Sequence, residues 1–260
     1  MMEELHWKTA ITKVEPNKLL LRGYRIDELM GRVSFSQAVY LTLTGELPQE
    51  KVGRLIDAIL VASLDHGATP PSTLAALTVA STGAPLNASL ASGILTITHL
   101  HGGAVEGCMR VVLEGVKRME ESNRSPSEVA EELVQEYKEK RKRILGFGHR
   151  IHTKDPRTAK LYTLASELGI AGKHVQMAKA LEEALSRSLG KSLPINVDGA
   201  IGSLLCEIGI PPEIANLFFI MARVAGLTAH IHEEKTRQRP MRRIHPTDHE
   251  YDGTSERTLP

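Results

Sequence analysis

Apolar residues recur every three to four positions along most of this chain, and this periodicity constrains its fold more than any other feature. Between residues 49 and 65 they follow the i, i+3, i+4, i+7 spacing of one helical face. The same spacing is found over residues 104–119, 127–137, 175–189 and 214–229. Because each apolar face must be buried against another element, the chain is predicted to be all-α.

Prolines and short polar side chains mark the expected helix starts. The prolines concerned are Pro70, Pro71, Pro126, Pro156, Pro211 and Pro212, and the expected caps are Ser125 and Asp155. The N-terminal part is the exception to the helical pattern. Residues 9–14 and 19–23 flank Glu15-Pro16-Asn17, which predicts a small β-hairpin.

The bulk properties exclude several classes of protein. The 260 residues carry a formal net charge of +1, which argues against a nucleic-acid partner or a membrane surface. We expect no apolar run long enough to span a bilayer, and the acidic N-terminus lacks the apolar stretch of a signal peptide. Cys108 and Cys206 lie in apolar helical patterns, so they are predicted to be reduced core thiols of a cytoplasmic protein.

Glycines suggest how the chain is divided. Gly102 and Gly103, together with the glycines between 199 and 202, bracket about a hundred residues with helical patterns. If both points are hinges, a small domain of residues 104–202 closes over a large domain of residues 1–103 and 203–260. Alternatively, these glycines serve close helix packing, and the sequence leaves both interpretations open.

Histidines, aspartates and arginines gather in a few glycine-containing segments. They are Asp65-His66-Gly67, His101-Gly102-Gly103, Gly146-Phe147-Gly148-His149-Arg150 with Asp155-Pro156-Arg157, Asn196-Val197-Asp198-Gly199, and Arg223 with Gln238-Arg239-Pro240. In this order they resemble the citrate synthase superfamily. Within that superfamily, the compact length and the amino-acid sequence around Asp198 are most similar to the citryl-CoA lyase branch, which also forms the C-terminal module of ATP citrate lyase.

The resemblance implies a fold of a large and a smaller helical domain with the active site in the cleft between them. It also implies that Asp198 is the base that removes the α-proton of an acetyl thioester. Taken alone, Asp198 could equally be a simple cap, because a helix is expected to begin near Gly199 and helix N-termini stabilise carboxylates.

The resemblance assigns roles to three histidines. His149 would donate a hydrogen bond to the ketone oxygen of oxaloacetate, His101 would stabilise the thioester enolate, and His66 would bind substrate. Each could instead be structural, since histidine at a helix C-terminus or in a turn is common. Gly146, Phe147, Gly148 and Arg150 resemble the coenzyme A-binding loop, where glycines allow close approach of the backbone to a ligand.

Three arginines match those that bind the dicarboxylate in the family: Arg157, Arg223 and Arg239. The planar guanidinium binds carboxylates bidentately and keeps its charge, which suits this role. Arg223 interrupts an apolar helix, and a buried arginine needs an anion. By the resemblance, Arg239 reaches into the site of a neighbouring subunit, so the active unit would be a homo-oligomer, at least a dimer.

The expected function is carbon–carbon cleavage of citryl-CoA to acetyl-CoA and oxaloacetate, with coenzyme A as part of the substrate. Condensation by a citrate synthase-type enzyme stays open, as do a non-catalytic acyl-CoA-binding protein and a metal-dependent hydrolase. A separate citryl-CoA synthetase could supply the thioester. We expect no metal and no nucleotide redox cofactor, because no ligand set, Walker loop or dinucleotide fingerprint is recognisable. The basic run over residues 138–143 could be a solvated helix face or could attract coenzyme A phosphates.

Overall fold

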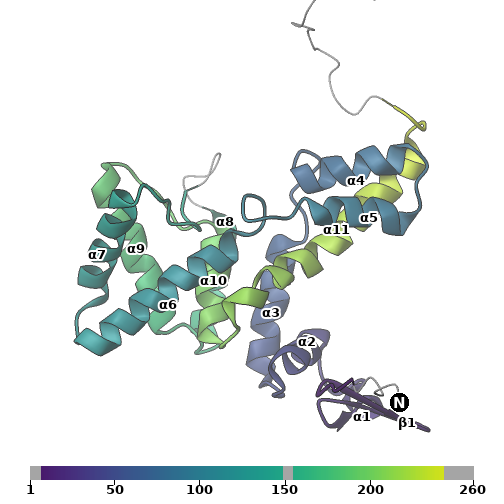
Figure 1. Ribbon diagram of the computed structural model, residues 1–260, viewed down its shortest axis with the longest axis horizontal. Coiled ribbons are helices and arrows are strands. Elements are labelled where there is room, and N and C mark those ends of the chain that lie inside the picture. Colours follow the sequence, from purple (N-terminus) through teal and green to yellow (C-terminus); the bar gives the residue numbers. More distant parts are fainter. Residues whose placement is uncertain (1–6, 149–154, 243–260) are drawn as a thin grey trace, which may run out of the picture. The chain divides into compact units, whose positions relative to one another are not determined.

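The computed structural model describes residues 7–148 and 155–242, and these are mostly helical, which confirms the all-α prediction (Figure 1). The helices are α1 (Ile26–Leu29), α2 (Phe35–Thr44), α3 (Glu50–Ser63), α4 (Pro71–Ser81), α5 (Leu86–Leu95), α6 (Ala104–Ser122), α7 (Pro126–Glu139), α8 (Pro156–Glu167), α9 (Lys173–Leu189), α10 (Val197–Glu207) and α11 (Asn216–Arg237), with a short 3-10 turn, η1 (Pro212–Ile214). Every helix expected from the periodicity is present.

The predicted N-terminal hairpin is also confirmed. Strands β1 (Thr12–Glu15) and β2 (Lys18–Leu21) pair antiparallel, and a two-residue strand, β3 (Tyr24–Arg25), adds to β2. Asn17 in the turn has a φ of 57°, a left-handed conformation that asparagine tolerates better than most residues.

The predicted helix caps form as expected. Ser125 and Glu128 make a reciprocal capping box at the start of α7. The Asp155 carboxylate accepts a hydrogen bond of 3.0 Å from the Arg157 backbone N–H at the start of α8. Local sequence therefore determines where these two helices begin.

The chain divides into two compact units. Unit 1 contains Met1–Asp65 and Ile97–Arg223, and unit 2 contains His66–Thr96 and Val224–Pro260. One boundary lies within α11, after Arg223. The glycines predicted boundaries after residues 103 and 202, which differ from the boundaries of these two units. The predicted division describes a hinge motion, which contacts within the units do not test, so it stays a prediction.

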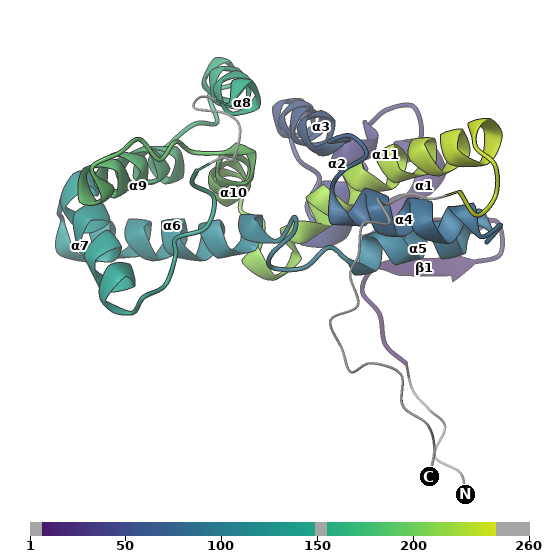
Figure 2. The ribbon, with the colours of Figure 1, turned by 90° about the horizontal axis from the view of Figure 1, so that it is seen from above.

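The core of unit 1 is aliphatic and is built largely by α6, α7, α9 and α10, which lie together in both views (Figures 1 and 2). Its fully buried side chains include Met109, Leu133, Met177, Leu181 and Leu204. Burial of such a side chain contributes about 1.5–3 kcal/mol relative to an exposed one. This core holds in place the helices that carry the candidate site.

Both cysteines are buried free thiols, as predicted. Burial raises the pKa of the Cys108 thiol to about 12. Burial also raises the pKa of Cys206. Because a thiol in this state is protonated at neutral pH, neither cysteine has the character of a nucleophile.

Glu207, at the end of α10, binds the start of α9. Its Oε1 accepts hydrogen bonds from the backbone N–H groups of Gly172, His174 and Val175 at 2.7, 3.0 and 3.0 Å. Its Oε2 lies 3.0 Å from His174 Nδ1. The Glu207 side chain is only 7% exposed. Burial raises the pKa of Glu207, but the hydrogen bonds outweigh it and hold the pKa below 4.5. A carboxylate on α10 thus caps α9.

We expect Glu207→Gln to lower the free energy of unfolding at pH 7 by about 1–3 kcal/mol, the typical contribution of buried hydrogen bonds to a charged group. Because the pKa of Glu207 is lowered in the folded state, its contribution is present above the ordinary value of 4.5 and is lost as the pH falls below it. Urea unfolding from pH 7 to pH 3.5 measures the difference between wild type and variant. A difference that grows below pH 4.5 would contradict this account.

Unit 2 is a small helical cluster of α4, α5 and the C-terminal part of α11 (Figure 2). Its core residues are Ala76, Ala80, Leu227 and Ile231. Gly93 of α5 lies so close to α4 that a Cβ there would be 2.8 Å from the Ser72 carbonyl oxygen. Small residues therefore allow the close approach of these helices.

The expectation that no apolar run could span a bilayer needs correction for Pro212–Arg237. Among the described residues this helical stretch is long and apolar enough by length and composition, although 44% of its apolar window is buried. A core helix passes the same test, and α11 supplies Phe218 to one core and Leu227 and Ile231 to the other. The apolar length is thus explained by packing.

Candidate functional site

Asp198 lies in the first turn of α10 and is not its cap. The helix begins at Val197, earlier than expected, and the cap is Asn196, whose Oδ1 accepts a hydrogen bond of 3.1 Å from the Gly199 N–H. The interpretation of Asp198 as a simple cap is therefore wrong. Burial raises the pKa of the Asp198 carboxyl, and the nearby Asp155 raises it further.

Arg157 and Arg223 lie close enough to Asp198 to lower its pKa, although burial dominates. Arg157 is held by the buried Asp155, which accepts from its Nε at 3.1 Å and from its Nη2 at 2.9 Å. Nη1 of Arg157 lies 3.4 Å from the Ala62 carbonyl oxygen. The structure thus brings the predicted base and two predicted substrate arginines together in unit 1.

Arg223 is a buried cation with unused hydrogen-bond donors. It is 3% exposed, and its Nε and Nη1 have no hydrogen-bond partner within the described part of the chain. Its guanidinium carbon lies 4.7 Å from the centroid of the Phe219 ring. Burial lowers the pKa of Arg223, while the negative charges of Asp65 and Asp198 oppose this change. Such a group is suited to bind an anion.

His101 lies next to this arginine's aromatic neighbour. Its ring meets the Phe219 ring edge-on, with the centroids 6.1 Å apart and an interplanar angle of 81°. Gly102 has a φ of +75°, and a Cβ there would be 2.5 Å from the Phe219 ring. The glycine therefore lets the turn that carries His101 pack directly on Phe219.

The glycine loop, residues 146–148, packs against the start of α10. A Cβ on Gly199 would be 2.2 Å from the Gly146 carbonyl oxygen, and one on Gly146 would be 2.8 Å from Gly199 Cα. Gly146 also has a φ of +90°. These two glycines are thus required because the loop and the helix that carries Asp198 touch through their backbones.

We expect Gly199→Ala to lower the free energy of unfolding by about 1–3 kcal/mol or more, because its Cβ would collide with backbone rather than with a movable side chain. Activity should fall as well, since relief of the collision moves Asp198 or the loop. Thermal unfolding measures the first effect and turnover the second. The control is Gly107→Ala on α6, where a Cβ would meet only side-chain atoms of Leu145, which can move aside. Equal effects of the two substitutions would contradict the collision.

Several predicted site residues are not placed at this site. His66 and Arg239 are exposed residues of unit 2. Arg239 lines a cavity of about 230 Å³ with Ser81, Glu234 and other residues of that unit. His149 and Arg150 lie outside the described residues. Their expected roles, like the cleft between two domains, stay predictions.

Sequence reasoning missed Phe219, and it assigned Asp155 only a capping role. Phe219 precedes Arg223 by four positions on α11, so the two share one helical face. That spacing was a usable signal. Asp155 both caps α8 and binds the Arg157 side chain, and its position two residues before Arg157 gave no signal of the second contact.

Within residues 7–148 and 155–242, no group of three or more His, Cys, Asp or Glu side chains is arranged to hold a metal ion. A cavity of about 480 Å³ lies beside the glycine loop in unit 1. Phe147, Ile144 and Leu193 supply apolar surface, and the cationic residues that line it are Lys138, Lys142, Arg143 and Lys191. Its chemistry suits an amphipathic anion.

Comparisons with known proteins find similar sequences and similar folds. The family model for the C-terminal domain of citrate synthase matches residues 48–246. Citrate synthase from Haloferax volcanii is 33% identical over 197 residues, which cover 74% of this chain and 49% of that protein. This chain spans about half the length of the first curated relatives it matches.

Solved structures match over almost the whole chain. The structure of citryl-CoA lyase from Hydrogenobacter thermophilus has a TM-score of 0.89 and 44% identity, covering 98% of this chain and 97% of that one. A variant of ATP citrate lyase from Methanosaeta concilii, in complex with (3S)-citryl-CoA, has a TM-score of 0.82 and 26% identity, covering 98% of this chain and 43% of that one.

Proposed function

Since this chain belongs to the citrate synthase family, we propose that it is a citryl-CoA lyase that cleaves citryl-CoA to acetyl-CoA and oxaloacetate. One observation carries the proposal. The citryl-CoA lyase structure is 44% identical to this chain and has a TM-score of 0.89, whereas the citrate synthase from Haloferax volcanii is 33% identical over 74% of this chain. The likeness is therefore greater to the lyase than to this synthase.

In the proposed reaction, the bond between the hydroxyl-bearing carbon and the methylene of the thioester breaks. The hydroxyl proton passes to His149 as the ketone forms, and the bond's electron pair becomes the acetyl-CoA enolate. His101 stabilises this enolate, and Asp198 delivers a proton to its carbon. Charges and protons balance, because one proton leaves oxygen and one reaches carbon.

The electrostatics of Asp198 support this role. Burial raises the pKa of its carboxyl, so the acid form that the cleavage direction needs is easier to populate. Proton transfer is most efficient when the pKa of the group lies near the working pH. The adjacent Arg157 and Arg223 limit the rise, because they stabilise the carboxylate that remains once Asp198 has delivered its proton.

We further propose that Arg223 and Arg157 bind the carboxylates of the substrate. The free donors of Arg223 support this, because a buried guanidinium without hydrogen-bond partners is costly unless a ligand supplies them. The cavity beside the glycine loop would take the nucleotide end of coenzyme A. Its apolar surface suits the adenine ring, and Lys138, Lys142 and Lys191 suit the phosphates.

Condensation of acetyl-CoA with oxaloacetate is the second candidate function. The citrate synthase matches favour it. His101 favours it too, because the C-terminal module of ATP citrate lyase is expected to lack a histidine at this position. Both directions share one transition state, so the same residues would serve either. The two candidates differ in the fate of citryl-CoA. The lyase cleaves its carbon–carbon bond, whereas the synthase forms citryl-CoA and then hydrolyses its thioester.

Two assays separate these functions. The first supplies citryl-CoA and detects oxaloacetate by its enzymatic reduction with NADH; the second supplies acetyl-CoA and oxaloacetate and detects free thiol. We expect oxaloacetate from citryl-CoA and little free thiol, in EDTA as in buffer alone. Free thiol without oxaloacetate formation would establish the synthase. Loss of activity in EDTA would point to a metal-dependent enzyme, and inactivity in both assays would reject both functions.

The assembly and location remain proposals. A homo-oligomer in which Arg239 reaches a neighbouring site follows from the family resemblance. A hinged domain of residues 104–202 follows from the glycines that bracket it, and a cytoplasmic location from the two cysteines. The exposure of Arg239 is compatible with the first of these. Light scattering of the purified protein, with and without citrate, gives the oligomeric state.

A further inference from the structure

Residues 193–196 connect the glycine loop to the helix that carries Asp198. The Gly148 N–H donates to the Pro194 carbonyl oxygen at 2.7 Å, and the Asn196 N–H donates to the Gly146 carbonyl oxygen at 3.0 Å. The Asn196 side-chain Nδ2 donates to the Gly148 carbonyl oxygen at 2.9 Å. This short segment therefore pairs with the glycine loop along its length.

The same segment leads directly into α10. Asn196 is both a partner of the glycine loop and the cap of α10, two residues before Asp198. A displacement of residues 193–196 would therefore move the loop and the base together. The contacts that hold residues 193–196 in place therefore determine the geometry of both the glycine loop and Asp198.

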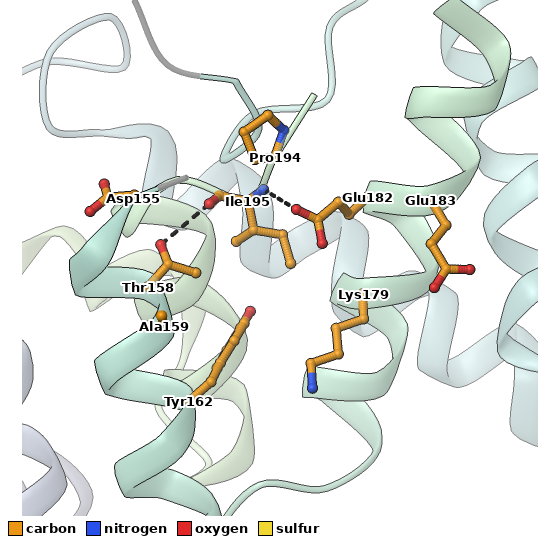
Figure 3. Close-up of a pocket in the computed structure, with 9 residues that line it drawn as sticks. All are labelled: Asp155, Thr158, Ala159, Tyr162, Lys179, Glu182, Glu183, Pro194 and Ile195. Carbon is orange, nitrogen blue, oxygen red and sulfur yellow. Dashed lines mark hydrogen bonds between the residues drawn. The ribbon is translucent and has the colours of Figure 1, made fainter. Parts of the chain in front are cut away.

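Two helices hold Ile195, at the centre of this segment, from opposite sides (Figure 3). Glu182 of α9 accepts a hydrogen bond from the Ile195 N–H at 2.7 Å, and Thr158 of α8 donates to the Ile195 carbonyl oxygen at 3.3 Å. Ser186 of α9 adds a hydrogen bond from the Leu193 N–H at 3.1 Å. Ile195 is 3% exposed, so its amide depends on Glu182 for a partner.

Glu182 is not engaged in an ion pair in residues 7–148 and 155–242. Lys179, three positions earlier on α9, instead lies 5.6 Å from the centroid of the Tyr162 ring. Both face a cavity of about 260 Å³ between α8, α9 and residues 194–195 (Figure 3). The half-buried Glu182 carboxylate thus has one described partner, the Ile195 amide. A hydrogen bond to an ionised acceptor is stronger than a neutral one.

We propose that Glu182 is a positioning residue, which holds the glycine loop and Asp198 in their working geometry through the Ile195 amide. This inference rests on the proposed function, because it gives a role to the geometry of that same site. Glu182 acts only through residues 193–196. Catalysis is sensitive to such positioning, since a misplacement of about 1 Å can cost roughly 100-fold in rate.

The test compares Glu182→Leu and Glu182→Gln with Glu183→Leu in the full chain. Leu removes the acceptor, whereas the Gln amide oxygen can still accept from Ile195. Glu183 is the matched control, because it is the next residue on α9 and is exposed. Its carboxylate forms an exposed ion pair with Arg187, at a distance of 3.7 Å. Steady-state assays with citryl-CoA, thermal unfolding and amide hydrogen exchange are measured for each.

We expect Glu182→Leu to lower kcat by roughly 10-fold or more. Glu182→Gln should keep most of the wild-type kcat, and Glu183→Leu should have the same kcat as the wild type. Exchange of the Gly148 and Asn196 amides should accelerate in Glu182→Leu at temperatures where the variant stays folded. A merely structural role would lower the unfolding temperature without these two signatures. Wild-type kcat in Glu182→Leu, or faster exchange confined to Ile195, would overturn the proposal.

The two proposals can fail separately. If the wild-type protein is inactive with citryl-CoA and in the condensation assay, the proposed function has failed. The role of Glu182 is then judged by exchange alone, and unchanged Gly148 and Asn196 exchange in Glu182→Leu overturns it. If the wild type is active and Glu182→Leu is equally active, only the positioning role has failed.

Discussion

Asp198→Asn is expected to lower kcat for citryl-CoA cleavage by about 10³- to 10⁴-fold, the loss typical of removing a group that takes part directly in the chemistry. Asparagine keeps the size of the side chain but can neither carry nor accept the transferred proton. The fold should survive, because Asn196 rather than Asp198 caps α10. Removal of a partly buried carboxylate can even raise the unfolding temperature.

Turnover of purified Asp198→Asn, measured with citryl-CoA at saturating concentration, checks this expectation. Glu213→Gln is the control, because it removes a carboxylate from an exposed ion pair with Arg110. That variant should keep wild-type kcat. Wild-type-like turnover of Asp198→Asn would remove Asp198 from the proposed role, and an unfolded variant would show that its position in the first turn is structural.

Arg223→Met is expected to raise KM for citryl-CoA by roughly 100-fold, because truncating one partner of a buried charge pair costs about 2–5 kcal/mol. In the absence of ligand, the same substitution should leave stability equal or increased. The wild-type guanidinium has two buried donors without partners in the described part of the chain, and methionine has none to satisfy. Methionine also retains packing against Phe219.

The stability and the binding of Arg223→Met should thus change in opposite directions. Urea unfolding gives the first, and KM together with calorimetric titration of oxaloacetate gives the second. Arg110→Met, at an exposed arginine paired with Glu106, is the control and should leave KM unchanged. An unchanged KM in Arg223→Met would count against its proposed role, and a large loss of stability would show that its donors are satisfied.

The helices and their starts were predictable because their signals are local. The periodicity over residues 49–65 and 175–189 predicted α3 and α9, and Ser125 and Asp155 marked the starts of α7 and α8. The start of α10 was misplaced by two residues. Both Asn196 and Asp198 are good caps, and local sequence does not determine which of them accepts the first free N–H.

The candidate site was predictable only in part. Asp198, Arg157 and Arg223 were expected from the family resemblance, and the structure brings them together. Phe219 was missed although its four-residue spacing from Arg223 was a usable signal, whereas nothing in the local sequence showed that the Asp155 carboxylate also binds the Arg157 side chain. The hydrogen bond between Glu182 and Ile195 joins residues 13 positions apart through a half-buried carboxylate, and it has no local signature.

The amino-acid sequence by itself determined the helical class, the positions of α3, α6, α7, α9 and α11, the N-terminal hairpin and the family, since all of these depend on short-range periodicity, caps and ordered motifs. Only the tertiary structure decided that Asn196 caps α10 and leaves Asp198 beside two arginines. It also decided that Gly146 and Gly199 touch and that Glu182 holds the segment between them. The physical reason is that close approach and burial are made by residues distant in sequence, so the packing selects among side chains that look equivalent along the chain.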